Sequence, residues 1–496
     1  MLLTSLLSLL LLTPPVAAPP LNLPVPLPPA APAAAAAGLW SDALKGKWLG
    51  NIELPGGESL GYVLTITGPE AALLGISEQG VVDAPLADVA INTATLKFAL
   101  RLPNAPAGAS PVWELTWSDG DHAKGTMRQS GMTLTSTLKR LAAGEDGAPK
   151  RPQTPKPPFP YTSREVAYTS FDGAALNGTL TIPAAAQFGK GPFACVLFIT
   201  GSGIQDRDET LFYHKPFAVI ADALARAGVA SLRVDDRGYH GAKDPLGGDG
   251  TTETFARDTA AGVEFLTTQA EIDAGRIGLL GHSEGGLIAP AVAAAKPALV
   301  DFIVLLAAPG VPGKEVLSVQ LVAILKAQGA SQETIDKAAA GQKVMLAAVA
   351  TGDEAAVRTL MLDAAKENDP SGTLKGPALE SAIDAGMKQV CSPWMRHFLT
   401  RDPRSALRET RCPVLILNGG KDVQVVAAQN VPEVTRALLE AGNTCVTARI
   451  FPNLNHLFQP VGDKGTGGVS EYNQIETTMD AAVLEEITRW VKAATK

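Results

Sequence analysis

The sequence predicts an α/β fold, in which a doubly wound, mostly parallel sheet with a helical insertion follows a small all-β barrel or sandwich domain. Three patterns predict it. Apolar runs alternate with helical stretches over residues 161–496, short and partly alternating runs fill residues 38–142, and strand signals disappear between about 310 and 407. With 496 residues, the chain is also too long for one ordinary core, so at least two domains are expected.

The first segment is typical of an export signal. The first 41 residues carry no charged side chain, and Leu2–Leu12 is an apolar run too short to span a bilayer. Small residues follow it, so we predict a signal peptide over residues 1–18, although Lys and Arg are missing at its start. The Pro/Ala-rich residues 19–37 predict an extended spacer. We therefore expect a secreted or periplasmic protein without a stable membrane anchor.

Residues 38–142 predict the all-β domain. Gly, Asp and Pro clusters separate its short runs, which are 44–53, 60–67, 95–101, 112–117, 122–128 and 132–138. The domain resembles small lipocalin-like β domains. Trp48, Trp113 and Trp117 are expected to fill its core, with a sugar-stacking platform as the alternative. Residues 143–160 contain six prolines and predict a semi-rigid linker.

The domain predicted over residues 161–496 alternates strand and helix. Residues 165–171 and 176–182 predict an antiparallel edge, and 192–199, 229–234, 276–280 and 300–306 predict further strands. From about 310 to 407 helical stretches replace strands, with Ser331 as an N-cap and Gly329 as a helix stop. This helical insert follows the sixth strand, and its apolar positions, such as Trp394 and Met395, either line a pocket or pack the insert itself.

A candidate nucleophile follows one of these strands. Residues 281–285 read Gly-His-Ser-Glu-Gly, which fits the G-x-S-x-G pattern of a strained strand-to-helix turn. An apolar run precedes the pattern, and a small-residue helical stretch, 285–295, follows it. The glycines that flank Ser283 relieve crowding at the turn. Ser283 is therefore the predicted nucleophile.

The two partners of a catalytic triad are expected downstream, in the order acid and then histidine. The strand from Cys412 ends in a Gly turn at Asp422, and the strand 444–451 is followed by a loop that carries His456. The reaction needs His456 to take the proton from Ser283 and a carboxylate to fix the imidazole tautomer. Asp235 and Asp236, after an earlier strand, are the rival acids.

An oxyanion hole needs two backbone N–H groups aimed at the developing negative charge. One is expected from Glu284, directly after the nucleophile. The other is expected from the Gly-rich loop 200–209, where we favour the Ser202 amide over that of Gly203. The four charged residues that end this loop, Asp206 to Glu209, are expected to form a network that braces it, with substrate contact as the alternative.

Together, these motifs resemble a bacterial α/β-hydrolase family of secreted serine esterases, related to the serine aminopeptidases and acyl-thioesterases. The matching segments are 201–209, 235–238, 281–290, 418–422 and 455–459. The resemblance implies an α/β-hydrolase fold and a triad of Ser283, Asp422 and His456. It also implies that the helical insert at about 310–407 is a cap over the active site, whose apolar positions could line an acyl pocket. The segment 237–242, Arg-Gly-Tyr-His-Gly-Ala, departs from the R-G-x-G-x-S usual in that family, which puts substrate contacts from that edge in doubt.

Composition narrows the class of partner. A net charge of −8 argues against nucleic acid, and no His/Cys spacing suggests a metal site or a cofactor. His214 and His240 are expected to be structural, or to line the rim of the site. The four cysteines, Cys195, Cys391, Cys412 and Cys445, permit two disulfides, but the sequence chooses no pairing.

The sequence thus predicts a serine hydrolase that cleaves carboxylic esters of short to medium acyl groups through an acyl-enzyme. The substrate is a small-molecule ester, and no cofactor is expected. A peptidase or a thioesterase is the alternative, since Asp206, Asp208, Glu209 and Glu284 could bind a free amino terminus. A non-catalytic binding protein is the remote alternative, which an intact triad and oxyanion loop argue against.

Overall fold

The computed structural model describes residues 40–496, except 54–58, 77–80, 102–109, 130, 131, 143, 146, 148 and 369–374. The predicted signal peptide and the Pro/Ala-rich spacer lie outside the described residues. The described chain forms two compact units, each with its own sheet.

The first unit is a nine-stranded antiparallel sheet in the order β4-β3-β2-β1-β9-β8-β7-β6-β5. Its strands are β1 (Gly46–Glu53), β2 (Ser59–Gly68), β3 (Ala71–Ile76), β4 (Val81–Pro85), β5 (Ala87–Ile91), β6 (Thr95–Ala99), β7 (Val112–Trp117), β8 (His122–Gln129) and β9 (Met132–Arg140). Only Leu86 separates the two outermost strands, β4 and β5, so the sheet curls into a nearly closed barrel. All six predicted runs are strands, whereas β3, β4 and β5 were not predicted.

Aromatic side chains fill the interior of this barrel. Trp48 and Trp113 are fully buried, and Trp117 packs on Trp48 with ring centroids 4.7 Å apart. Phe98 stacks on Trp113 at 5.0 Å. The tryptophans therefore fill the core, as expected, and form no exposed platform for a sugar.

The second unit is built on an eight-stranded sheet in the order β10-β11-β13-β12-β14-β15-β16-β17. Its strands are β10 (Thr162–Thr169), β11 (Ala175–Ile182), β12 (Phe193–Ile199), β13 (Ala230–Val234), β14 (Ile272–His282), β15 (Phe302–Leu306), β16 (Val414–Gly419) and β17 (Val446–Phe451). The first two strands pair antiparallel and the other six run parallel. The predicted mostly parallel sheet with an antiparallel edge is confirmed.

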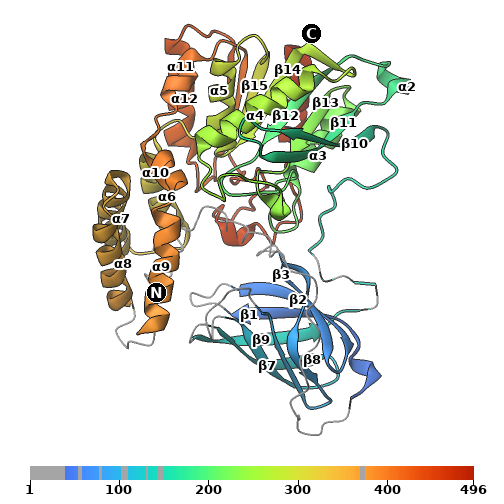
Figure 1. Ribbon diagram of the computed structural model, residues 1–496, viewed down its shortest axis with the longest axis vertical. Coiled ribbons are helices and arrows are strands. Elements are labelled where there is room, and N and C mark those ends of the chain that lie inside the picture. The colour runs from blue at the N-terminus through green and yellow to red at the C-terminus, as the bar shows by residue number, and fades with distance from the viewer. Residues whose placement is uncertain are drawn as a thin grey trace. The chain divides into compact units, whose positions relative to one another are not determined.

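Helices cover both faces of this sheet, as the chain's alternation predicts (Figure 1). One face packs against α4 (Thr252–Thr267), α5 (Gly285–Ala295) and α12 (Ala427–Glu440), and the other against α3 (Pro216–Arg226) and α13 (Ala481–Ala494). Successive residues of β12 point to opposite cores, with Cys195 and Leu197 on one face and Val196 and Phe198 on the other. Fully apolar strands such as β12 are required because both faces are buried. A short helix, α2 (Ala185–Phe188), precedes β12.

Six helices lie between β15 and β16, where the cap is predicted. They are α6 (Gly313–Ala327), α7 (Gln332–Thr351), α8 (Glu354–Asn368), α9 (Pro377–Val390), α10 (Pro393–Thr400) and α11 (Arg404–Glu409). The Ser331 side chain accepts the Thr334 amide at 3.2 Å and caps α7, and Gly329 has the positive φ of a helix stop. Both local predictions are confirmed.

The predicted linker, residues 143–160, contains two residues that are bound to the second unit. Arg151 is buried and donates to the carbonyl oxygens of Phe212, at 2.8 Å, and Asn473, at 3.0 Å. The Gln153 side chain accepts the amides of Thr478 and Met479. The main part of the compact second unit therefore begins at Arg151, which makes only the earlier part of this segment a candidate linker.

All four cysteines are free thiols in this structure. In the chain that the structure describes, no helix is both long and apolar enough to cross a membrane.

Candidate active site

Ser283 stands on a sharp turn between β14 and α5. Its φ of 52° lies in the left-handed region, which a non-glycine residue rarely adopts, and its amide donates to the Leu306 carbonyl at 2.9 Å. A Cβ on Gly281 would lie 2.1 Å from the Gly285 carbonyl, and one on Gly285 would lie 2.3 Å from the Ile199 carbonyl. Only glycine fits at either position. The turn leaves Ser283 partly exposed between two buried neighbours, His282 and Glu284.

Asp422 and His456 meet at the same edge of the sheet, after β16 and β17. His456 Nδ1 lies 2.8 Å from Asp422 Oδ2, and both side chains are almost completely buried. The other carboxylate oxygen, Oδ1, accepts the amides of Gln424 and Val425 at 2.8 and 2.9 Å. The carboxylate is therefore held in place, and it fixes the imidazole tautomer that carries its proton on Nδ1 and leaves Nε2 able to accept one.

His456 lies beside the nucleophile turn. The His282 and His456 rings have centroids 4.7 Å apart, and His282 Nε2 lies 3.1 Å from the His456 carbonyl oxygen. No hydrogen bond joins the Ser283 hydroxyl to the His456 ring among the described residues. Such bonds are often long without substrate and tighten when it binds.

Neither rival acid contacts His456. Asp236 accepts the Thr200 hydroxyl at 2.9 Å and the Gln205 amide at 2.8 Å, and Asp235 pairs with the Arg207 guanidinium. Burial raises the pKa of Asp236 well above its ordinary value. Both aspartates hold the loop 200–209, so the structure brings Asp422, and not these two, to the imidazole.

The loop 200–209 comes close to the nucleophile at Gly201. A Cβ on Gly201 would lie 3.3 Å from the Ser283 Cβ, so the two backbones are close neighbours. The Gly201 amide is already bound, since it donates to Glu209 Oε1 at 2.7 Å. In the described chain, the amides of Ser202, Gly203 and Glu284 donate to no protein group. The predicted pair, Ser202 and Glu284, is therefore available to an oxyanion, and Gly203 is equally unbound.

The charged end of this loop forms the predicted bracing network. Asp206 accepts the Thr210 amide at 2.7 Å, and Arg207 pairs with Asp235 and Glu165. Asp208 pairs with two cations, Lys215 directly before α3 and Arg233 of β13.

The side chain of Glu284 has a role that the sequence did not reveal. It is buried, and it accepts the Thr252 hydroxyl at 2.6 Å and the Trp394 indole N–H at 2.8 Å. Burial raises its pKa, against the hydrogen bonds from Thr252, Trp394 and Ser202. Glu284 thus joins the nucleophile turn to the start of α4 and to α10 of the insert. The only sequence signal for this contact is a glutamate directly after the serine of the G-x-S-x-G pattern.

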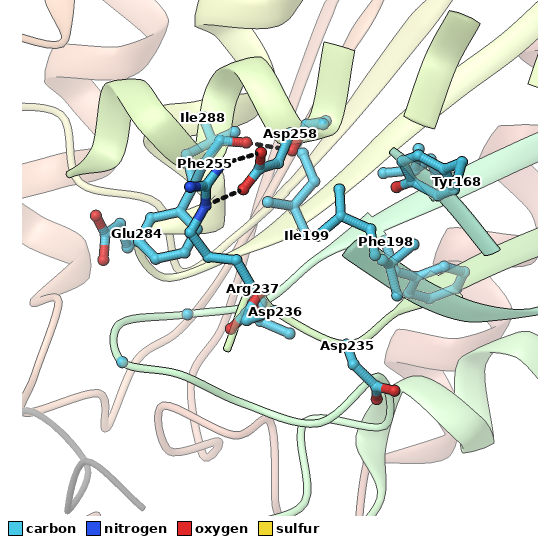
Figure 2. Close-up of a pocket in the computed structure, with 17 residues that line it drawn as sticks. Tyr168, Phe198, Ile199, Asp235, Asp236, Arg237, Phe255, Asp258, Glu284 and Ile288 are labelled. Carbon is cyan, nitrogen blue, oxygen red and sulfur yellow. Dashed lines mark hydrogen bonds and ion pairs between the residues drawn. The ribbon is translucent and has the colours of Figure 1, made fainter. Parts of the chain in front are cut away.

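A small cavity of about 40 Å³ lies behind the loop 200–209, lined by Asp236, Asp258 and Glu284 among others (Figure 2). Arg237 closes one side of it. The Arg237 guanidinium is 1% exposed and pairs with three carboxylates, those of Asp172, Asp244 and Asp258. The buried charge of this arginine therefore braces the altered segment 237–242 instead of reaching substrate.

The remaining histidines of interest lie apart from the triad. His214 is buried against Thr478 and the Tyr472 carbonyl, and burial lowers its pKa to about 4. His240 is exposed and has a φ of 48°. Among the residues that the structure describes, no three His, Cys, Asp or Glu side chains gather as metal ligands.

Comparison with known proteins gives one family match. The model of a family described as alpha/beta hydrolase matches residues 196–462, more than half of the chain. The esterase EstD of Thermotoga maritima is 29% identical over 320 residues, which are 64% of this chain and 65% of EstD. The chain thus matches just under two thirds of the length of EstD.

Solved structures resemble the chain at lower identity. An esterase of Pyrococcus furiosus, Pf2001, is 14% identical with a TM-score of 0.40, and the match covers 68% of this chain and 94% of that one. A dienelactone hydrolase of Anabaena variabilis is 16% identical with a TM-score of 0.37, over 68% of this chain and 99% of that one.

Proposed function

The chain belongs to the alpha/beta hydrolase family, and we propose that it is a serine hydrolase that cleaves carboxylic esters of short to medium acyl chains through an acyl-enzyme. One observation carries the proposal. A buried His456–Asp422 pair lies next to a serine held on a strained turn, at the carboxyl ends of parallel strands. The esterase activity named for EstD supports the same class of substrate.

In the proposed reaction, the Ser283 hydroxyl attacks the ester carbonyl while His456 Nε2 takes its proton. The Ser202 and Glu284 amides bind the oxyanion that forms. His456 then gives the proton to the leaving alcohol, and the acyl group remains on Ser283. Water, deprotonated by the same imidazole, attacks the acyl-enzyme and releases the acid. Asp422 stays ionised throughout and stabilises the imidazolium.

The aminopeptidase alternative needs a free carboxylate for the substrate's amino group. The four acids considered for this role are all bonded within the protein: Asp206 to Thr210, Asp208 to Arg233, Glu209 to Gly201, and Glu284 to Trp394. Drawing Asp208 or Glu284 away to a substrate would leave a partly buried donor without its acceptor, which costs about 1–3 kcal/mol. This supports an ester over a peptide. A thioester substrate needs no such acid and remains the second candidate.

The test compares p-nitrophenyl esters of increasing chain length with an acyl thioester and an aminoacyl p-nitroanilide. We expect the highest kcat/KM on the short and medium esters. Ser283→Ala should lose on the order of 10⁶-fold in rate, whereas the matched control Ser318→Ala, on exposed α6 surface, should keep it. Folded Ser283→Ala protein with wild-type ester hydrolysis would refute the mechanism, and a preference for the anilide would refute the substrate class.

Export to the periplasm or beyond, by residues 1–18, is part of the same proposal. Detection of a mature amino terminus after residue 18 in a secreted or periplasmic fraction would support it, and an intact cytoplasmic chain would refute it.

A further inference from the structure

A second buried acid–histidine pair lies next to the nucleophile turn. Glu209 Oε1 is 2.9 Å from His282 Nδ1, and the two side chains are 5% and 8% exposed. Glu209 ends the oxyanion loop, and His282 is the residue before Ser283. The reaction described above uses neither side chain.

The hydrogen-bond geometry sets the charge of this pair. His282 Nε2 faces the His456 carbonyl oxygen at 3.1 Å, and a carbonyl only accepts, so Nε2 carries a proton. Nδ1 faces Glu209 Oε1, which also accepts the Gly201 amide at 2.7 Å. That amide stabilises negative charge on the oxygen, which favours the shared proton on Nδ1. The hydrogen bonds therefore fit an imidazolium at His282 beside a carboxylate at Glu209.

One further observation agrees with an ion pair, and two others show that the position of Glu209 carries an energetic cost. Burial by itself lowers the pKa of His282, but the facing Glu209 carboxylate outweighs burial and, with Asp422 and the His456 carbonyl adding to it, raises the pKa above its ordinary value. Glu209 Oε2 is buried without a partner, so the charge of this carboxylate depends on Gly201 and His282. Glu209 also has a φ of 52°, a left-handed conformation that a non-glycine residue keeps only where its surroundings require it.

The pair joins three segments whose positions relative to one another matter for the reaction. Through Gly201 it holds the oxyanion loop, through the His282 backbone it holds the nucleophile turn, and through the carbonyl of His456 it holds the loop of the base. Because Glu209 occupies the Gly201 amide, the next amides along the loop are the ones left for an oxyanion.

We propose that Glu209 and His282 are positioning residues for ester hydrolysis, an ion pair that sets the oxyanion loop and His456 against Ser283. This rests on the proposed function. A displacement of about 1 Å in a reacting group can cost on the order of 10²-fold in rate. Losing the pair should therefore lower kcat, while KM for a small ester, whose ground state needs less exact placement, should change little.

Two single variants test the pair, the isosteric Glu209→Gln and the polar replacement His282→Gln, together with the double variant. Glu486→Gln is the matched control, because Glu486 on α13 is also a buried carboxylate in ion pairs, with Arg449 and Arg489. We expect kcat to fall roughly ten- to hundredfold in each single variant, and the double variant to lose no more than the worse single one. Glu486→Gln should lower the melting temperature and leave kcat unchanged. Wild-type kcat in folded Glu209→Gln protein, or additive losses in the double variant, would overturn the proposal.

The charge state is measured on the wild-type protein without reference to activity. The chain has six histidines, so ring ¹⁵N spectra of histidine-labelled protein are tractable, and His282→Gln assigns the resonance. We expect both His282 nitrogens to be protonated at neutral pH, and one to lose its proton in Glu209→Gln. A neutral His282 ring in the wild type would overturn the proposal, even if Glu209→Gln fails to fold. If no ester is hydrolysed at all, the proposed function fails, and this spectrum still decides whether the ion pair exists.

Discussion

Replacing Asp422 by Asn tests the contact that orients the base. Asp422 Oδ1 accepts two backbone amides, and Oδ2 faces His456 Nδ1 at 2.8 Å. An Asn side chain keeps the backbone bonds only if its oxygen takes the Oδ1 position, which turns its NH₂ group toward His456. Two donors would then face each other, so the imidazole changes tautomer and carries its proton on Nε2. That nitrogen can no longer accept the Ser283 proton.

The expected loss is about 10⁴-fold in kcat, the usual effect of the wrong tautomer in a triad, which corresponds to about 5 kcal/mol of transition-state stabilisation. Initial rates with p-nitrophenyl butyrate measure it, and a melting curve shows whether the variant is folded. Asp222→Asn is the control, because this carboxylate lies on α3 and bonds Tyr161 and Arg226. A folded Asp422→Asn variant within tenfold of the wild type would refute the assignment, above all if Asp235→Asn or Asp236→Asn were inactive.

Three further changes are informative. A chain beginning at Arg151 should hydrolyse a small ester like the full protein. A chain beginning at Tyr161 should have a lower melting temperature, because it lacks the bonds of Arg151 to the second unit. Equal melting temperatures would show that these bonds contribute little. Trp394→Ala should extend the range of acyl chains that are hydrolysed, because the Trp394 indole bonds Glu284 beside the nucleophile. Met395 is buried, so Met395→Ala should cost about 2–5 kcal/mol of stability and leave the acyl range unchanged. Identical chain-length profiles in the wild type and both variants would contradict a pocket role for Trp394. His214 has a folded pKa of about 4, below its ordinary value of 6.5, so its contribution to stability is present above pH 6.5 and is lost as the pH falls toward 4. Between pH 7.5 and 4.5 the wild type should therefore lose on the order of 3 kcal/mol more than His214→Gln in urea unfolding, and parallel losses would argue against this source of acid sensitivity.

The sequence was sufficient for the main sheet and for the positions of the candidate triad, for a physical reason. Strands buried on both faces must be apolar, so β12, β14, β15 and β16 stand out as runs. Carboxyl ends of parallel strands lie at one edge of a sheet. A polar residue just after such a run can therefore be placed at that edge without knowledge of the packing, which is how Asp422 and His456 were found.

Strands β3, β4 and β5 were missed because they lack that signal. β3 consists of small and aliphatic residues with no β-branched residue before Ile76, and β4 and β5 each include an aspartate with a positive φ, Asp83 at 44° and Asp88 at 51°. Aspartate is depleted in strands and tolerates the left-handed region, so local preference pointed to a turn. Pairing with neighbouring strands overrides that preference.

The contacts of Glu209 and Glu284 could not be predicted because they join residues far apart in the chain. Glu209 and His282 are 73 positions apart, and Glu284 and Trp394 are 110. No periodicity links such positions. Both glutamates stood in segments already assigned a role. Glu209 was expected to brace its own loop or to contact substrate, and the Glu284 side chain was considered only as part of a site for a substrate amino group.

The burial of three carboxylates, those of Glu209, Glu284 and Asp422, has a common explanation in the chemistry. Moving a carboxylate out of water costs several kcal/mol unless hydrogen bonds compensate, so Glu209, Glu284 and Asp422 are expensive as mere core residues. Each instead holds a different part of the site: Glu209 binds the oxyanion loop, Glu284 binds Trp394 of α10, and Asp422 binds the His456 imidazole. Loops at a sheet edge have few apolar contacts of their own, and an acyl-transfer site requires them to keep their positions within fractions of an ångström. Directional bonds to buried charge provide that constraint where apolar packing cannot, although the reaction proposed for Ser283 uses only Asp422 directly.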